Sequence, residues 1–183
     1  TLANMIEALL TLVAAAAGVA LKTMWDSYVK RQEAVELEVW KIRASQLERR
    51  LSLFYWPIYL RLQRDNLVWT KILARFEKKP SEEKLRLAYQ IDEGVLLQNH
   101  LEIVKLIETN IHLAKLDKEL ETALMAYVRH IDVYRSLRAL GIKDKDPIVF
   151  GEPFPKEFFA LLEQRLHQFQ AEYDELLRVR GVG

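Results

Sequence analysis

The sequence contains no cysteine, and this excludes disulfide bridges, thiolate metal sites and cysteine nucleophiles. Glycine and proline are scarce, with 6 and 5 residues among 183, so the chain has few helix breakers. No run alternates apolar and polar residues in the Val-, Ile- and Thr-rich manner of a β-strand. The formal net charge is only +1, which excludes a general nucleic-acid binder. These absences predict an all-α protein without cysteine chemistry.

The composition that remains is typical of helices. Half of the residues are apolar and 29% are charged, which indicates a folded rather than a disordered chain. The length suits one ordinary domain with an accessory element. We expect three parts: a transmembrane anchor helix at 1–21, a long amphipathic stalk helix at 22–56, and an antiparallel helical bundle at 57–183.

The N-terminal segment is the most distinctive part, because residues 5–21 carry a single charge, Glu7. A membrane-spanning helix needs about 20 mainly apolar residues, and residues 2–21 supply that length. Ala14 and Gly18 are four residues apart, a spacing that lets helices pack closely in a membrane. A glutamate is costly in lipid, so Glu7 is expected to face another helix or water. We therefore predict a transmembrane helix that packs against other helices.

The residues after this segment resemble a membrane boundary. Lys22 is the first basic residue, and the aromatic residues Trp25 and Tyr28 follow it, as is common at membrane interfaces. Because basic residues lie on this side only, the body of the protein is expected to face the cytoplasm. Two alternatives remain open: a helix buried in a soluble protein, and a signal-like or interfacial segment.

The stalk carries an apolar stripe. It runs from Leu21 to Ile42 in alternating steps of four and three residues, slips by one residue, and continues from Leu47 to Ile58. This heptad spacing is typical of a helix that pairs with another helix, and the slip alters the supercoil locally. The alternative is that the chain's own C-terminal helices cover the stripe. We expect an oligomer seam at Val35, Val39, Ile42, Leu47, Leu51 and Phe54.

The rest of the chain divides at breakers and caps. Pro57 should restart the helix, Ser81 and Asp117 should cap two helices, and Gly141 should end the second of these. Pro155 suits the first turn of a last helix. Apolar residues recur between these points at helical spacing, which predicts the bundle.

Residues 141–154 form the one long loop of the predicted bundle. Its prolines make it stiff, and its apolar residues need burial. The loop either binds a partner or packs on its own bundle. As a partner loop, its contact residues would be Pro147, Ile148, Val149, Phe150, Pro153 and Phe154.

No motif carries recognisable chemistry. The sequence has no Gly-x-Ser-x-Gly elbow, no Walker loop and no Gly-x-Gly-x-x-Gly fingerprint. Histidine and acid pairs such as Glu108 with His112 and Glu163 with His167 lack the Glu-x-x-His pattern of di-iron bundles. We therefore predict no enzyme, no cofactor and no metal site.

The predicted function follows from this layout. We expect a single-pass, membrane-anchored helical scaffold or interaction protein, in an oligomeric or multi-protein membrane assembly. Its expected partners are membrane lipid, other transmembrane helices, and copies of itself or subunits of a larger complex, with no specific nucleic acid. One alternative is a membrane-perturbing or channel-forming oligomer in which Glu7 lines or gates the pore. The other is a soluble helical bundle with a buried N-terminal helix.

Overall fold

A computed structural model of the chain describes residues 2–77 and 81–181. Every regular element among these residues is helical, so the prediction of an all-α fold is confirmed. The chain divides into two compact units, which we call unit 1 (Thr1–Ser45) and unit 2 (Gln46–Gly183). The description does not include the side chains of Ala3, Met5, Ile6, Ala8, Leu9, Thr11, Val13, Ala14 and Glu77.

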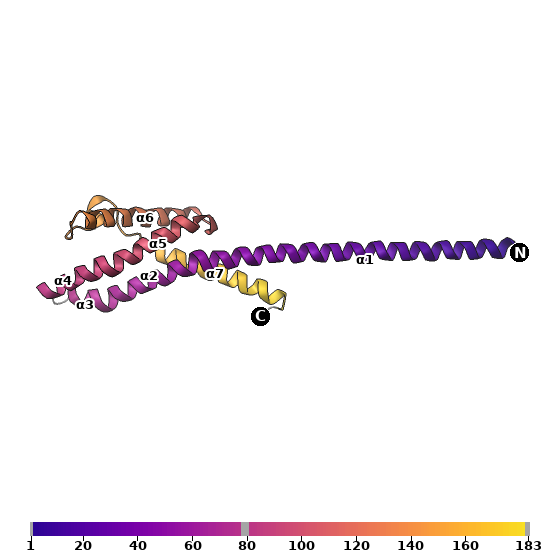
Figure 1. Cartoon of the computed structure of the whole chain (residues 1–183), viewed down its shortest axis with the longest axis horizontal. Helices are drawn as coiled ribbons and strands as arrows, with labels where there is room; N and C mark the ends of the chain where they lie inside the picture. The colour runs from indigo at the N-terminus through magenta and orange to yellow at the C-terminus, as the bar shows by residue number, and fades with distance from the viewer. Residues whose placement is uncertain (1, 78–80, 182–183) are drawn as a thin grey trace. The chain divides into compact units, whose positions relative to one another are not determined.

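Unit 1 consists of most of helix α1 (Leu2–Arg50), which is drawn in indigo and purple in Figure 1. The predicted transmembrane helix finds no support among the described residues, because none of their helices is both long and apolar enough to cross a membrane. The sequence offers a physical reason. Asn4 and Glu7 fall in the first turns, and the alanines near Gly18 contribute little apolar surface.

Unit 2 contains the last turn of α1 and the remaining helices. Several of these are interrupted by π-helical turns rather than by loops, so the chain stays helical over long stretches. The first such stretch comprises the π-turn η1 (Leu51–Tyr55), α2 (Trp56–Val68), the π-turn η2 (Trp69–Leu73) and α3 (Ala74–Glu77).

The second stretch comprises α4 (Glu82–Ile91), the π-turn η3 (Asp92–Leu96), α5 (Leu97–Asn110) and the 3₁₀ turn η4 (Ile111–Leu113). Helix α6 (Lys118–Ala139), the 3₁₀ turn η5 (Pro147–Phe150) and α7 (Glu157–Val179) complete the unit.

The predicted caps explain where these helices begin and end. The hydroxyl of Ser81 accepts a hydrogen bond from the Lys84 amide at 3.3 Å and caps α4. The carboxylate of Asp117 accepts one from the Leu120 amide at 2.9 Å and caps α6. Gly141 follows α6 with a φ of 73°, a conformation that glycine adopts without steric cost. These predicted boundaries are confirmed.

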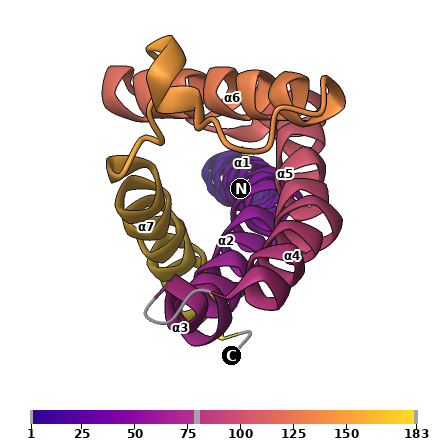
Figure 2. The same cartoon turned by 90° about the vertical axis from the view of Figure 1, so that its left-hand side faces the viewer.

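Four helices of unit 2 form a closed ring. Helix α2 contacts α5 and α7, and α6 contacts the same two helices from the opposite side. Figure 2 shows this arrangement, with α6 across the top and α5 and α7 at its two ends. The predicted helical bundle is therefore confirmed. Its interior is filled by fully buried side chains that include Phe54, Tyr55, Ile58, Ile103, Ile107, Leu120, Leu124, Tyr127, Ile131, Phe158 and Leu162.

Candidate functional site

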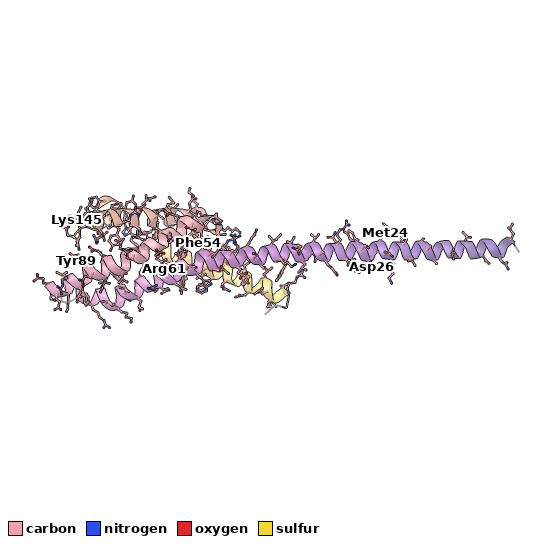
Figure 3. All side chains as sticks on the ribbon, viewed as in Figure 1. Met24, Asp26, Phe54, Arg61, Tyr89 and Lys145 are labelled. Atoms are coloured by element: carbon pink, nitrogen blue, oxygen red, sulfur yellow. The ribbon has the colours of Figure 1, made fainter. Side chains whose placement is uncertain are left out.

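The apolar stripe of α1 is exposed throughout unit 1. Its six apolar members there have exposed fractions between 54% and 68%. The rings of Trp25 and Tyr28 lie 6.2 Å apart on this stripe. In Figure 3 the labelled side chains of Met24 and Asp26 extend outward from the same helix. We call these six residues the α1 seam: Leu21, Trp25, Tyr28, Val35, Val39 and Ile42.

The C-terminal half of the predicted oligomer seam lies elsewhere. Leu47, Leu51 and Phe54 are all buried in the core of unit 2. The ring of Phe54 packs edge-on against Tyr55 at 5.0 Å, and Figure 3 labels Phe54 within the bundle. In this chain these three residues therefore hold the bundle together, whereas Val35, Val39 and Ile42 stay exposed. The structure thus divides the predicted seam at the boundary between the two units.

The residues predicted for the membrane helix and its interface are also exposed where they are described. Glu7, Gly18 and Lys22 are exposed on α1, and the side chain of Ala14 lies outside the described residues. Among the described residues, a Cβ atom added to Gly18 would meet nothing within 4 Å. The roles of these residues in a membrane stay predictions.

The predicted partner loop is held firmly at its start. The guanidinium of Arg138 on α6 donates hydrogen bonds to the carbonyl oxygens of Ile142 at 2.9 Å and Lys145 at 3.2 Å. It also donates to the carboxylate of Asp92 in η3 at 3.0 Å, and the hydroxyl of Tyr134 donates to the same carboxylate. One arginine therefore fixes both the first turn of the loop and its position on η3.

The tip of the loop exposes three consecutive apolar side chains on a fixed backbone. Asp146 accepts a hydrogen bond from the Ile148 amide at 2.9 Å, and Pro147 is buried. Gly151 has a φ of 80°, which only glycine adopts readily. The side chains of Ile148, Val149 and Phe150 are 59%, 66% and 55% exposed.

The end of the loop packs on the bundle. Glu152 pairs with Arg129 at 3.2 Å, and its carbonyl oxygen lies 2.8 Å from Nδ1 of His130, which must donate because a carbonyl only accepts. Pro153 is exposed, and the ring of Phe154 meets that of His130 edge-on at 5.4 Å. The ends of the loop therefore pack on the bundle and its tip is exposed, and the role of the tip in binding a partner stays a prediction.

A buried polar cluster links three helices of the bundle. The amide nitrogen of Asn99 on α5 donates to the carboxylate of Asp65 on α2 at 2.8 Å. Nδ1 of His100 on α5 lies 2.8 Å from the hydroxyl of Tyr127 on α6, and 3.4 Å from the second carboxylate oxygen of Asp65. That second oxygen is buried and accepts no hydrogen bond. Arg61, also on α2, donates to the side-chain oxygen of Asn99 at 2.8 Å.

Burial sets the protonation states in this cluster. It raises the pKa of Asp65 from 3.8 to about 6, an effect that the hydrogen bond from Asn99 partly offsets. It lowers the pKa of His100 from 6.5 to about 4, with a smaller contribution from His130. Burial also raises the pKa of Tyr127 well above 10. At pH 7 the cluster therefore holds one carboxylate, a neutral imidazole and a protonated phenol.

Sequence reasoning missed this cluster because its members are far apart in the chain. Asp65, Asn99 and Tyr127 each stand alone on an amphipathic helix, where a polar residue usually faces solvent. The available signal was the position of Asn99 and His100 within an otherwise apolar helix face. The residues that Asn99 and His100 contact can be named only when the packing of the bundle helices is known.

Two hollows on the surface of the described residues lie away from the cluster, one at the start of α4, near Tyr89, and the other at the end of α7, near Arg178. Within the described part of the chain, no three side chains of His, Asp or Glu are grouped to hold a metal ion. The hydrogen bonds of the cluster join α2, α5 and α6.

The chain matches no protein-family model, no curated protein and no solved structure.

Proposed function

We propose that this protein is a helical scaffold or interaction subunit of an oligomeric or multi-protein assembly, without a catalytic role. The observation that supports this proposal is the α1 seam, a row of six exposed apolar side chains on one face of a long helix that is interrupted at Gln32. Single exposed apolar residues are common on proteins, but contiguous apolar surfaces usually mark sites of association.

Helix stability supports the same proposal. Most of the stability of a helix in water comes from burial of its apolar face, and the helical propensity of its residues adds less. Exposure of the aromatic and branched side chains of the α1 seam to water is unfavourable. We expect these side chains to be buried when the protein is assembled. The α1 seam is thus a surface that a second helix would stabilise.

The loop tip provides a second surface of a different kind. Ile148, Val149 and Phe150 stand on a backbone that Arg138 and Asp146 hold in place, so their positions are set before any partner arrives. A preorganised surface loses little conformational entropy on binding. The proposal therefore assigns contact with another subunit to the loop as well as to α1.

Membrane attachment through residues 2–21 is the second part of the proposal. Its support is the low charge of this segment and the basic residues Lys22, Lys30 and Arg31 that follow it. Since basic residues favour the cytoplasmic side, we propose that the body faces the cytoplasm. Small residues in such a segment favour contact with other membrane helices over isolation in lipid.

The native mass of the full chain tests the scaffold proposal. In mild detergent, light scattering should give a mass above that of one chain for the wild type. Replacement of Val35 and Val39 by lysine should reduce the mass to that of one chain, because two charges would be buried at the contact. Ala34→Lys, which adds one charge beside the α1 seam, should keep the wild-type mass. A wild-type chain that is monomeric and binds no other protein would contradict the proposal.

Fractionation of expressing cells tests the membrane part separately. The wild type should sediment with membranes and resist extraction by high salt, whereas Leu12→Arg with Val19→Arg should appear in the soluble fraction. Thr23→Arg, placed after the segment, is the matched control and should stay with the membranes. A soluble wild-type chain of high native mass would reject membrane attachment and keep the scaffold role.

A further inference from the structure

The residues beside the α1 seam carry a charge pattern of their own. In a heptad written a to g, the seam residues Trp25 and Val39 occupy a positions, together with Gln32, and Leu21, Tyr28, Val35 and Ile42 occupy d positions. The flanking positions then follow. The g positions are Met24, Arg31 and Glu38, and the e positions five residues later are Val29, Glu36 and Arg43.

From this pattern we propose that the α1 seam binds a second copy of the same chain in a parallel, in-register, two-stranded coiled coil. The inference rests on the proposed function and names its partner. In a parallel pair, each g residue lies beside the e residue of the next heptad on the other helix, and these pairs set partner and orientation.

All three resulting pairs are complementary. Met24 would contact Val29 of the second copy, an apolar pair. Arg31 would face Glu36 of the second copy, and Glu38 would face Arg43, with the signs reversed. By symmetry each charged pair occurs twice. No pair brings like charges together, so the chain's own sequence supplies both sides of the contact.

These complementary pairs cannot form within one helix. Side chains interact along a helix at spacings of three and four residues, whereas Arg31 and Glu36 are five apart. The local neighbour of Glu38 is Lys41, whose amine lies 2.8 Å from the Glu38 carboxylate. The charges of Arg31, Glu36 and Arg43 are exposed on the helix, where a second chain can reach them.

The length and the one polar core position fit the same arrangement. Residues 21–45 span more than three heptads, about 37 Å at 1.5 Å per residue, which is enough for a coiled coil. Gln32 is the single polar residue at an a position between Leu21 and Ser45. When the two chains are in register, Gln32 faces its own copy and the two amides can bond each other. A buried polar a residue favours that register at some cost in stability.

One candidate within the chain already has its apolar face buried. Helix α7, the last helix of the chain, turns Phe158, Leu162 and Leu166 into the core of unit 2, where α2 and α6 pack against it. That apolar face is therefore already in use. The complementary helix that the α1 seam lacks is best supplied by α1 of another molecule.

Disulfide cross-linking of the full chain in mild detergent tests the orientation directly. The natural chain has no cysteine, so Val35→Cys introduces a single thiol. In a parallel, in-register pair, residue 35 faces its own copy, and mild oxidation should link most of the protein into dimers. In an antiparallel pair over residues 21–45, d residues face a residues and residue 35 lies opposite residue 32. Val35→Cys would then not link to itself, but mixed Val35→Cys and Gln32→Cys chains would link to each other. Ala34→Cys, away from the core, is the control and should remain mostly unlinked.

Charge exchange tests the pairing. Arg31→Glu and Glu36→Arg each place like charges together twice, and each should weaken self-association about tenfold. The double variant restores opposite charges and should return to within about twofold of the wild type. A mixture of the two single variants should form mixed dimers preferentially, since every pair in them is then complementary.

The outcomes separate this inference from the proposed function. A mass of two chains, self-linking of Val35→Cys and rescue by the double exchange support the inference. An associated chain that cross-links only in the antiparallel mixture, or that has a mass above two chains, overturns it and leaves the scaffold role intact. A chain that is monomeric and binds no other protein overturns both, whereas a monomer that binds a different protein overturns the inference alone.

Discussion

Unit 1 and unit 2 are built from similar residues, but the side chains of the apolar stripe are exposed in the first and buried in the second. On α1, Ile42 is 57% exposed, whereas Leu47, five residues further along the same helix, is 2% exposed. The difference is the presence of neighbouring helices in unit 2. An apolar stripe therefore indicates that a helix face will be buried, but it does not indicate which helix will bury it.

Polar groups differ between the two parts in the same way. In the bundle they join different helices: Trp56 donates to Gln170 at 3.1 Å, and Tyr59 donates to Glu163 at 2.8 Å. On α1 the ion pair between Lys41 and Glu38 is local and exposed, a kind that contributes little to stability. The bundle is therefore specified by its own contacts, whereas the polar contact of unit 1 joins residues within a single helix.

The largest expected effect is on the free energy of unfolding, when a core residue and an α1 seam residue are each replaced by alanine. Phe158 is fully buried, and Phe158→Ala should lower the free energy of unfolding of the bundle by about 3–5 kcal/mol. Val39→Ala should leave it within about 0.5 kcal/mol of the wild type, because Val39 contacts no core. Urea titrations followed by tryptophan fluorescence measure both, at a protein concentration below that of self-association. Equal destabilisation by the two substitutions would show that α1 and the bundle unfold as one structure.

The second prediction concerns the dependence of bundle stability on pH. Asp65 has a pKa of about 6 in the fold and 3.8 ordinarily, so its contribution to stability grows as the pH falls from 6 towards 4. His100 has a pKa of about 4 in the fold and 6.5 ordinarily, so as the pH falls His100 is protonated in the unfolded chain before it is protonated in the folded chain. Its contribution is therefore lost as the pH falls from 6.5 towards 4. Each shift corresponds to about 3 kcal/mol, and in the wild type the two oppose each other.

Single substitutions should separate these two contributions. Asp65→Asn leaves the histidine alone, so this variant should lose stability on acidification more steeply than the wild type. His100→Gln leaves the carboxyl group, so this variant should lose less or gain. Unfolding free energies at pH 7 and pH 4.5 give the comparison, and the same variants should not alter any property of unit 1. Parallel pH profiles for the two variants would show that the cluster does not titrate in this range.

The smallest expected effect concerns two buried tyrosines of the bundle. The hydroxyl of Tyr55 is buried and has no hydrogen-bond partner among the described residues, and burial raises its pKa to about 12. Tyr55→Phe removes an unsatisfied group, so it should leave the stability unchanged or raise it by up to about 1 kcal/mol. Tyr127→Phe removes the hydrogen bond to His100 and should cost about 1 kcal/mol. Thermal unfolding followed by circular dichroism distinguishes the two signs, and a loss of stability in Tyr55→Phe would reveal a partner for its hydroxyl.

The sequence predicted local structure well, because local structure depends on neighbouring residues. Ser81, Asp117 and Gly141 mark helix ends through hydrogen bonds and backbone angles that involve only a few adjacent positions. The π-turns at Leu51–Tyr55 and Asp92–Leu96 were not predicted, because the extra residue in such a turn is accommodated by packing against other helices.

The candidate sites were predictable in part. The loop at Pro147–Phe150 was visible from its prolines and its run of apolar residues. The split between its packed ends and its exposed tip was not, because it depends on Arg138 and His130 of another helix. The tie between Asp65 and Asn99 was missed for the same reason.

The sequence by itself determined that this protein is helical, where most of its helices end, and that α1 carries an apolar stripe with steps of four and three residues. These properties follow from propensity, capping and periodicity, which act over a few residues. Only the tertiary structure decided that Leu47 and Phe54 belong to the bundle core while Val35 and Val39 remain exposed. Burial depends on which surfaces meet, and residues distant in the chain supply those surfaces.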